Sequence, residues 1–113
     1  MPLPDTEALR VVLCNAPEEA AVRIADTLVV EGLAACVNLL GPVRSVYVWD
    51  GAVQHDTEVT LLVKTTAAAM SALTARIVAL HPYELPEVVA VPVAADEGHA
   101  PYLAWVAAQV RRP

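Results

Sequence analysis

Phenylalanine is absent from this sequence, and aromatic residues make up only 4% of the chain. Hydrophobic residues nevertheless reach 57%, so the core has to be built from valine, leucine, isoleucine and alanine. A chain of 113 residues with this composition favours one folded domain over disorder. We assign residues 1–7 to a loose N-terminal arm and residues 8–113 to that single domain.

Basic residues are scarce, because seven lysines and arginines stand against 13 acidic residues, for a net charge of −6. No basic stripe runs along the sequence, which argues against nucleic acid and anionic membranes as partners. No apolar run approaches the roughly 20 residues that a transmembrane helix needs. The first residues do not resemble a secretory signal peptide, so we expect a cytoplasmic protein.

Glycine and cysteine are also few. The four glycines form no P-loop, no GxSxG motif and no glycine-rich phosphate turn, so we predict neither an enzyme nor an organic cofactor. The two cysteines, Cys14 and Cys36, lie in apolar stretches and form no CxxC pair. They are either two free buried thiols or one metal ligand and one core residue, rather than a disulfide framework.

What the sequence does contain is a long hairpin pattern over residues 43–66, with Asp50-Gly51 at its turn. This dipeptide is typical of a type I′ turn, in which both central residues have positive φ. Pairing across the turn sets Val48 opposite Val53. Side chains alternate along a strand, so one face is predicted to join the core: Val46, Val48, Val53, His55, Thr57, Val59, Leu61 and Val63. The opposite face is predicted to carry Val43, Ser45, Tyr47, Gln54, Asp56, Glu58, Thr60, Leu62 and Lys64.

The first half of the chain also predicts a strand at residues 8–14 and another at residues 34–40. Between them lies a helix, which Asn15 is predicted to cap, Glu18 to support through a capping box, and Gly32 to end. Its buried stripe is predicted to be Ala21, Ile24, Ala25, Leu28 and Val29. Gly41-Pro42 is expected to bend the chain without ending the sheet.

The second half predicts a helix at residues 67–80, a strand at residues 88–93 and a closing helix at residues 99–110. Pro92 indicates an edge strand or a bulge, because proline cannot donate to a strand ladder. The buried stripe of the first of these helices is predicted to be Met70, Leu73, Ile77 and Leu80.

The resulting order, β-α-β-β-α-β-α, predicts an α+β fold: a ferredoxin-like split βαβ plait with an added C-terminal helix. Both main helices are then expected on one face of an antiparallel sheet. The second strand would lie at a sheet edge, and here that strand is long and apolar. Because a bare apolar edge invites aggregation, we expect an oligomer that covers it.

Metal-ligating side chains are present without a recognised ligand spacing: Cys14, His55, His81 and His99. His81 is the best placed of them, because it opens a loop at residues 81–86 that two prolines make rigid. The alternative explanation of a histidine there is a favourable interaction with the C-terminus of the preceding helix.

Lys64 is the only lysine, and it lies in an apolar strand. A buried lysine needs a partner, but Glu58 lies about 20 Å away along the same strand. We predict a carboxylate partner such as Glu87 or one from a neighbouring subunit. The alternatives are a bound anion, or a lysine whose stem packs while its head reaches water.

The segments LAACVNLL, SVYVWDG, LLVKT, HPYELPEVVAVPV and YLAWV occur in the order and spacing of the CutA divalent-cation-tolerance proteins, so the chain resembles that family over about residues 11–110. The resemblance implies a ferredoxin-like subunit, a PII-like homotrimer, and a link to copper and other divalent cations. It also implies a copper site at Cys14 and His81, with Leu80 in place of a further histidine. A third donor would come from Glu84, Glu87 or water.

A cleft between subunits is a further implication of the resemblance, and its candidate lining residues are Trp49, Glu58, Lys64, Tyr83, Glu84 and Glu87. We therefore predict a homotrimeric, non-enzymatic protein that binds or responds to a divalent metal such as copper, with itself and the metal as its partners. The alternatives are a trimeric sensor of an anionic metabolite and a structural or adaptor trimer.

Overall fold

The computed structural model describes residues 8–111, so the N-terminal arm assigned to residues 1–7 lies outside the described residues. The elements follow the predicted order: β1 Leu9–Ala16, α1 Glu18–Val30, β2 Cys36–Trp49, β3 Ala52–Thr66, α2 Met70–Leu80, β4 Val89–Pro92 and α3 Ala100–Gln109. A short 3-10 helix, η2 at Ala67–Ala69, precedes α2. Within the described residues, no helix is long and apolar enough to cross a membrane.

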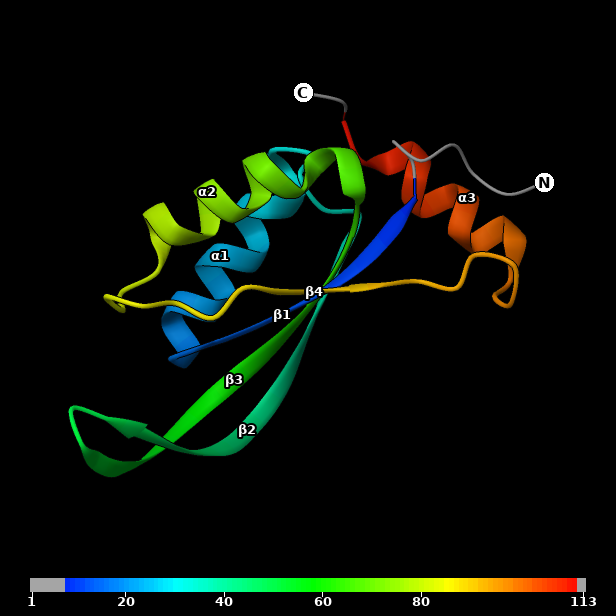
Figure 1. Cartoon of the computed structure of the whole chain (residues 1–113). Coiled ribbons are helices and arrows are strands. Elements are labelled where there is room, and N and C mark those ends of the chain that lie inside the picture. The colour runs from blue at the N-terminus through cyan, green and yellow to red at the C-terminus, as the bar shows by residue number, and fades with distance from the viewer. Residues whose placement is uncertain (1–7, 112–113) are drawn as a thin grey trace.

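The four strands form one antiparallel sheet in the order β2-β3-β1-β4, with α1 and α2 on one of its faces (Figure 1). This arrangement confirms the predicted α+β fold with a four-stranded sheet. It also confirms that β2 lies at an edge. β4 occupies the other edge, which explains how Pro92 is accommodated without breaking an internal ladder.

The start of α1 differs from the prediction. Asn15 does not cap the helix, because β1 continues through Ala16 and Pro17 occupies the N-cap position without a side-chain hydrogen bond. The pairing of β1 with β3 holds Asn15 in the strand opposite Thr60. The predicted end is confirmed: Gly32 has φ +73°, and its carbonyl accepts a hydrogen bond of 2.8 Å from the backbone N–H of Arg111.

The core lies between α1, α2 and the central strands. The predicted helix stripes supply it with Ile24 and Leu28 from α1 and with Leu73 and Ile77 from α2, all fully buried. Met70 and Leu80 are partly buried against the same cluster. Val29 is half exposed, so its inclusion in the α1 stripe was wrong.

The hairpin prediction is confirmed at the turn. Asp50 and Gly51 have φ +56° and +77°, and Val48 lies opposite Val53. The sheet also continues past Gly41-Pro42, with a register shift between Leu40 and Val43. A bulge at this point lets one strand bend without ending.

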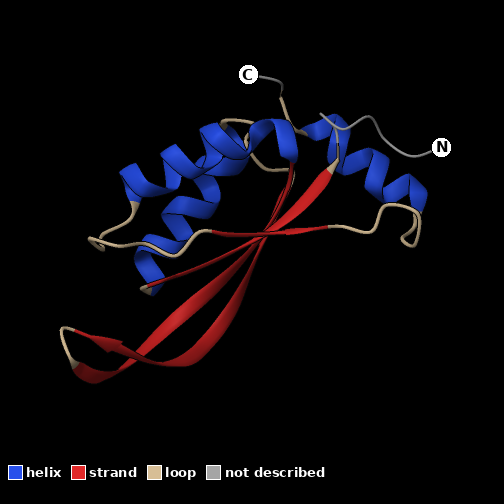
Figure 2. Cartoon of the chain, in the orientation of Figure 1, coloured by secondary structure: helices blue, strands red, loops and turns tan. Residues whose placement is uncertain are grey.

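The core face predicted for this hairpin is correct only near its base. Val59, Leu61 and Val63 pack against the core, but Val46, Val48 and Val53 are 63%, 68% and 61% exposed. His55 and Thr57 are exposed as well. The reason is that the β2–β3 hairpin extends beyond both helices of the core, so no layer covers its outer half (Figure 2).

The overall shape reflects this extension. The molecule measures 48 × 27 × 22 Å, and its radius of gyration is 14.7 Å. A compact domain of about 100 residues has a radius of gyration of about 13 Å. The single chain is therefore more extended than a compact domain, because the outer half of the β2–β3 hairpin projects from it.

The sheet face opposite α1 and α2 is also apolar. The strand registers place on it Val11, Leu13, Leu40, Leu62, Val89 and Val91. α3 reaches one end of this face, where Tyr102 lies beside Cys36. Leu40, Val89 and Val91 remain about half exposed.

Gly51→Ala tests the hairpin turn. An added methyl group would meet no atom within 4 Å, so its whole cost is the strain of an alanine at positive φ. We expect the free energy of unfolding to fall by about 1 kcal/mol. Urea unfolding at one protein concentration measures this. Asp50→Gly is the control and should not destabilise the protein, since Asp50 already has φ +56°. An unchanged midpoint for Gly51→Ala would contradict the turn assignment.

Candidate functional site

A cleft of about 590 Å³ opens beside the outer half of the hairpin. It lies between the end of β1, the strands β2 and β3, and the loop at residues 81–87 that joins α2 to β4. Its lining residues are Asn15, Ser45, Val46, Tyr47, Trp49, Glu58, Tyr83, Glu84, Leu85 and Glu87. Five of the six residues predicted for a cleft between subunits line this cleft within one chain, and Lys64 lies outside it. A cleft between subunits stays a prediction.

The charged side chains that line the cleft are all acidic. Among the described residues the lining contains three glutamates and no lysine, arginine or histidine. Three aromatic residues, Tyr47, Trp49 and Tyr83, contribute the largest side chains. A cleft lined in this way attracts cations, and its aromatic rings add faces of negative potential.

His81 anchors the loop that forms one wall of the cleft. Its Nε2–H donates to the backbone carbonyl of Asn15 at 2.8 Å, and its Nδ1 accepts the backbone N–H of Tyr83 at 3.1 Å. The two partners assign a neutral imidazole with its proton on Nε2. The rings of His81 and Tyr83 also pack together, with centroids 4.6 Å apart. His81 therefore fixes where Tyr83 stands.

Asn15 connects the same loop to the sheet through its side chain. Its Nδ2 donates to Oε1 of Glu87 at 3.2 Å, and its Oδ1 accepts the hydroxyl of Thr60 at 2.5 Å. The sequence reading missed this role because asparagine before Pro-Glu is typical of a helix cap. Only the pairing of β1 with β3 shows that Asn15 faces the cleft.

Glu58 is the most buried acid of the cleft, with 6% of its surface exposed. Its Oε2 accepts the hydroxyl of Tyr83 at 2.7 Å. Burial, followed by this hydrogen bond and the charge of Glu58, raises the pKa of Tyr83 well above its usual range. Nearby, Asp56 accepts the hydroxyl of Tyr47, and that bond is the main cause of the raised pKa of Tyr47. Both tyrosines therefore stay protonated at neutral pH.

The two predicted metal ligands, Cys14 and His81, both contact the backbone carbonyl oxygen of Asn15. The Sγ of Cys14 lies 4.0 Å from the backbone carbonyl of Asn15, which also accepts from His81. Burial, then the charges of Glu87 and Glu58, raise the pKa of the Cys14 thiol to about 12. A metal would have to displace the thiol proton and one hydrogen bond of the imidazole.

Further donors are not gathered around this pair. Within residues 8–111, no group of three or more His, Cys, Asp or Glu side chains is placed to hold a metal ion. Leu80 is partly buried against the core. The pair Cys14–His81 offers two donors, and a copper site there stays a prediction.

Lys64 is paired differently from the prediction. Its ammonium donates to Oδ1 of Asn38 on the neighbouring strand, and the sulfur of Cys36 lies 3.9 Å from it. The proposed partner Glu87 is wrong for this chain, because Glu87 bonds to Asn15 instead. A carboxylate from a neighbouring subunit stays a prediction.

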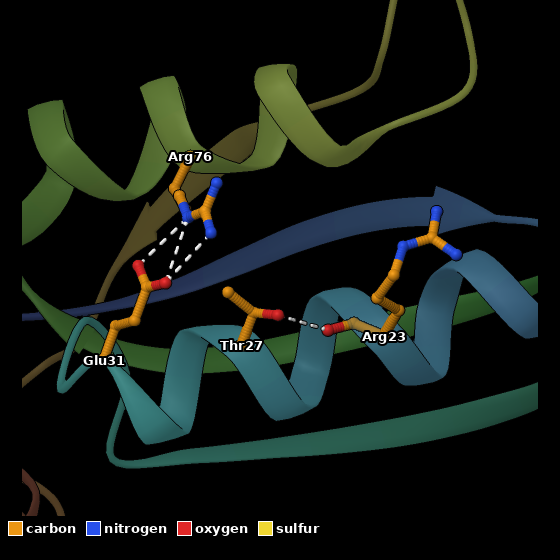
Figure 3. A network of polar contacts seen from close by, with 4 residues as sticks. All are labelled: Arg23, Thr27, Glu31 and Arg76. Carbon is orange, nitrogen blue, oxygen red and sulfur yellow. Dashed lines mark hydrogen bonds and ion pairs between the residues drawn. The ribbon is translucent and has the colours of Figure 1, made fainter.

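The ion pair found among residues 8–111 lies away from the cleft. Arg76 of α2 contacts Glu31 at the end of α1 with distances of 3.0 and 3.3 Å (Figure 3). Both side chains are about 40% exposed, so the pair contributes little beyond joining the two helices. The charges of the cleft are not neutralised by it.

These features define a small α+β protein with a ferredoxin-like sheet, an exposed hairpin and an acidic aromatic cleft. The family model described as CutA1 divalent ion tolerance protein matches residues 10–109, so the chain belongs to the CutA family. The divalent-cation tolerance protein CutA of Thermus thermophilus is 52% identical over 97 residues, which cover 85% of this chain and 92% of that protein.

Two further relatives extend the comparison. Protein CutA of Mus musculus is 44% identical over 89 residues, which cover 79% of this chain. The chain spans about half of that protein, 49% of its length. The solved structure of the PII-like protein CutA from Nostoc sp. PCC 7120 is 40% identical with a TM-score of 0.87, and the match covers 92% of this chain and 99% of that chain.

The buried thiol of Cys14 should make the free energy of unfolding depend on pH in the alkaline range. Its thiol ionises near 9.0 in an unfolded chain and near 12 when folded, so the folded state holds a proton that the unfolded state has lost. The corresponding stability is fully present below about pH 9 and is lost as pH rises toward about 12. Urea unfolding of the parent and of Cys14→Ser, at matched pH values across this window, measures it.

The variant should lose less stability than the parent over that window, because serine has no such proton. Cys36→Ser controls for the removal of a thiol as such. The raised pKa of Tyr83 acts in the same direction in every variant, so the difference between parent and Cys14→Ser isolates the thiol. Equal losses in the two proteins would contradict the assignment.

Proposed function

We propose that this protein works as a cytoplasmic homotrimer in divalent-cation tolerance and that it binds or responds to a divalent metal such as copper. The family supplies the link to divalent cations, since the Thermus relative carries divalent-cation tolerance in its name. The observation that carries the oligomer is the uncovered apolar surface of the sheet and hairpin. The cytoplasmic assignment rests on two cysteines that are both free.

Self-association explains an otherwise unfavourable surface. Val46, Val48 and Val53 project from an arm that no helix covers, and β2 leaves a long edge unpaired. Valine side chains exposed together favour association, and an unpaired edge invites another strand. A closed ring of three copies covers edges and apolar faces without leaving a free end.

The proposed metal ligands are Cys14 and His81, supported by their shared contact with the carbonyl of Asn15. A thiolate and an imidazole suit copper better than magnesium or calcium. Glu84 and Glu87 are the candidate third donors, since both lie on the loop that follows His81. The geometry favours a weak site that forms only when the thiol loses its proton.

The alternative of an anionic-metabolite sensor receives less support. That hypothesis places the anion on Lys64 in a cleft between subunits, but the ammonium of Lys64 already donates to Asn38. The cleft itself is lined by glutamates, which repel anions. An adaptor trimer has no particular observation in its favour.

Val48→Asp should weaken the trimer. Light scattering of the parent should give three times the chain mass of 12.0 kDa, and the variant should give a smaller value at micromolar concentration. A charge at Val48 has to be desolvated when another copy packs on the hairpin. Val30→Asp is the matched control, because Val30 is 73% exposed on the surface of α1 and Val48 is 68% exposed. A monomeric parent would overturn the proposal.

Copper titration in competition with a chelator tests the metal ligands. Cys14→Ser and His81→Ala should each lower the affinity by about tenfold or more, whereas His99→Ala, at the start of α3, should not. The affinity of the parent should fall about tenfold for each unit of acidification, because binding displaces a thiol proton. Leu80→His should strengthen binding if the geometry of the family carries over. If both ligand variants bind as the parent does, the ligands lie elsewhere.

A further inference from the structure

Glu58 is a buried carboxylate without a positive partner in the part of the chain described. It is 6% exposed, and its hydrogen bond comes from the neutral hydroxyl of Tyr83. No lysine, arginine or histidine among residues 8–111 lies within ion-pair distance of it. Burying an unpaired charge is costly, and one hydroxyl offsets only part of that cost. A cationic partner from outside this chain would offset the cost of burying the Glu58 carboxylate.

The cleft around Glu58 has the size and lining for an organic molecule. Its volume of about 590 Å³ lies within the usual range for small-molecule sites. Trp49 and Tyr47 present ring surface, and Leu85 presents aliphatic surface. These side chains can cover the apolar body of a ligand, while the rings also attract a positive charge.

A bare metal ion fits this lining poorly. A hard divalent ion takes six or more oxygen ligands at about 2–2.6 Å. The described residues hold no group of three or more His, Cys, Asp or Glu side chains that could take a metal ion. The aromatic and aliphatic surface would also stay exposed to water around a single ion.

We propose that the cleft binds a small organic cation, an ammonium group attached to an apolar body. The ammonium donates to the carboxylate of Glu58, and the body packs against Trp49 and Leu85. Glu84 and Glu87, on the loop beside it, add to the negative potential at the entrance. The proposal goes beyond divalent-cation tolerance, because it requires neither Cys14 nor a bound metal.

Three phenyl compounds of similar size, namely benzylammonium, benzyl alcohol and benzoate, separate the effect of charge from that of apolar contact. They are titrated into the full chain carrying Trp105→Phe, which leaves Trp49 as the single fluorescent tryptophan. Benzylammonium should change the fluorescence saturably, benzyl alcohol should bind about tenfold more weakly, and benzoate should not bind. Tenfold corresponds to about 1.4 kcal/mol, the lower end expected for a charged hydrogen bond.

Glu58→Gln tests the buried carboxylate. Glutamine keeps the shape and can still accept the hydroxyl of Tyr83, so the fold should persist, and benzylammonium binding should fall at least about tenfold. Glu97→Gln is the matched control, because its loop lies at the far end of the sheet from residues 81–87 (Figure 1). Glu84→Gln should give a smaller loss of benzylammonium binding, and this loss should disappear in high salt, which screens exposed charges. This second variant keeps the proposal testable if Glu58→Gln fails to fold.

Three results would overturn the inference: benzoate or benzyl alcohol binding as tightly as benzylammonium, full binding by a folded Glu58→Gln variant, or no saturable binding of benzylammonium. The last result, combined with a trimer weakened by Glu58→Gln, would show that a basic side chain of a neighbouring copy occupies the cleft. Copper titration and light scattering on the same samples keep this failure distinct from a failure of the proposed function.

Discussion

The structure depends on one imbalance: both faces of its sheet are apolar, but the two main helices cover only one of them. Leu61 and Val63 are fully buried where β3 lies beneath α1 and α2. Farther along the same strand, Val53 stands on the same face with no helix above it. Because the hydrophobic effect scales with the area removed from water, the uncovered part favours association with other copies.

The cleft depends on a second constraint, the tie between the loop at residues 81–87 and the end of β1. Asn15 holds this loop twice, through its carbonyl to His81 and through its side chain to Glu87. These bonds set Tyr83 against Glu58 and leave a carboxylate buried in the wall. The carbonyl of Asn15 and the backbone N–H of Tyr83 occupy the two ring nitrogens of His81, so in this structure His81 positions the loop.

The charge of the cleft and the chemistry of Cys14 are linked. The same glutamates that make the cleft attractive to cations raise the pKa of the neighbouring thiol, in addition to its burial. A cation that reaches the cleft would oppose that effect, since positive charge favours the thiolate. If the proposed cation binds in the cleft, its binding and the ionisation of the Cys14 thiol favour each other.

The sequence by itself determined the order of elements, the hairpin register near the turn and most of the buried helix stripes, because these depend on local chemistry and on periodicity. Asp50-Gly51 fixed the turn, and Gly32 ended α1. Tertiary structure decided the rest. Asn15 has the chemistry of a cap, but strand pairing holds it at the cleft. The ammonium of Lys64 donates to Asn38 on the neighbouring strand rather than to an acid. Burial of the hairpin face depended on how far the helices reach along the sheet, a distance that alternation along a strand does not encode.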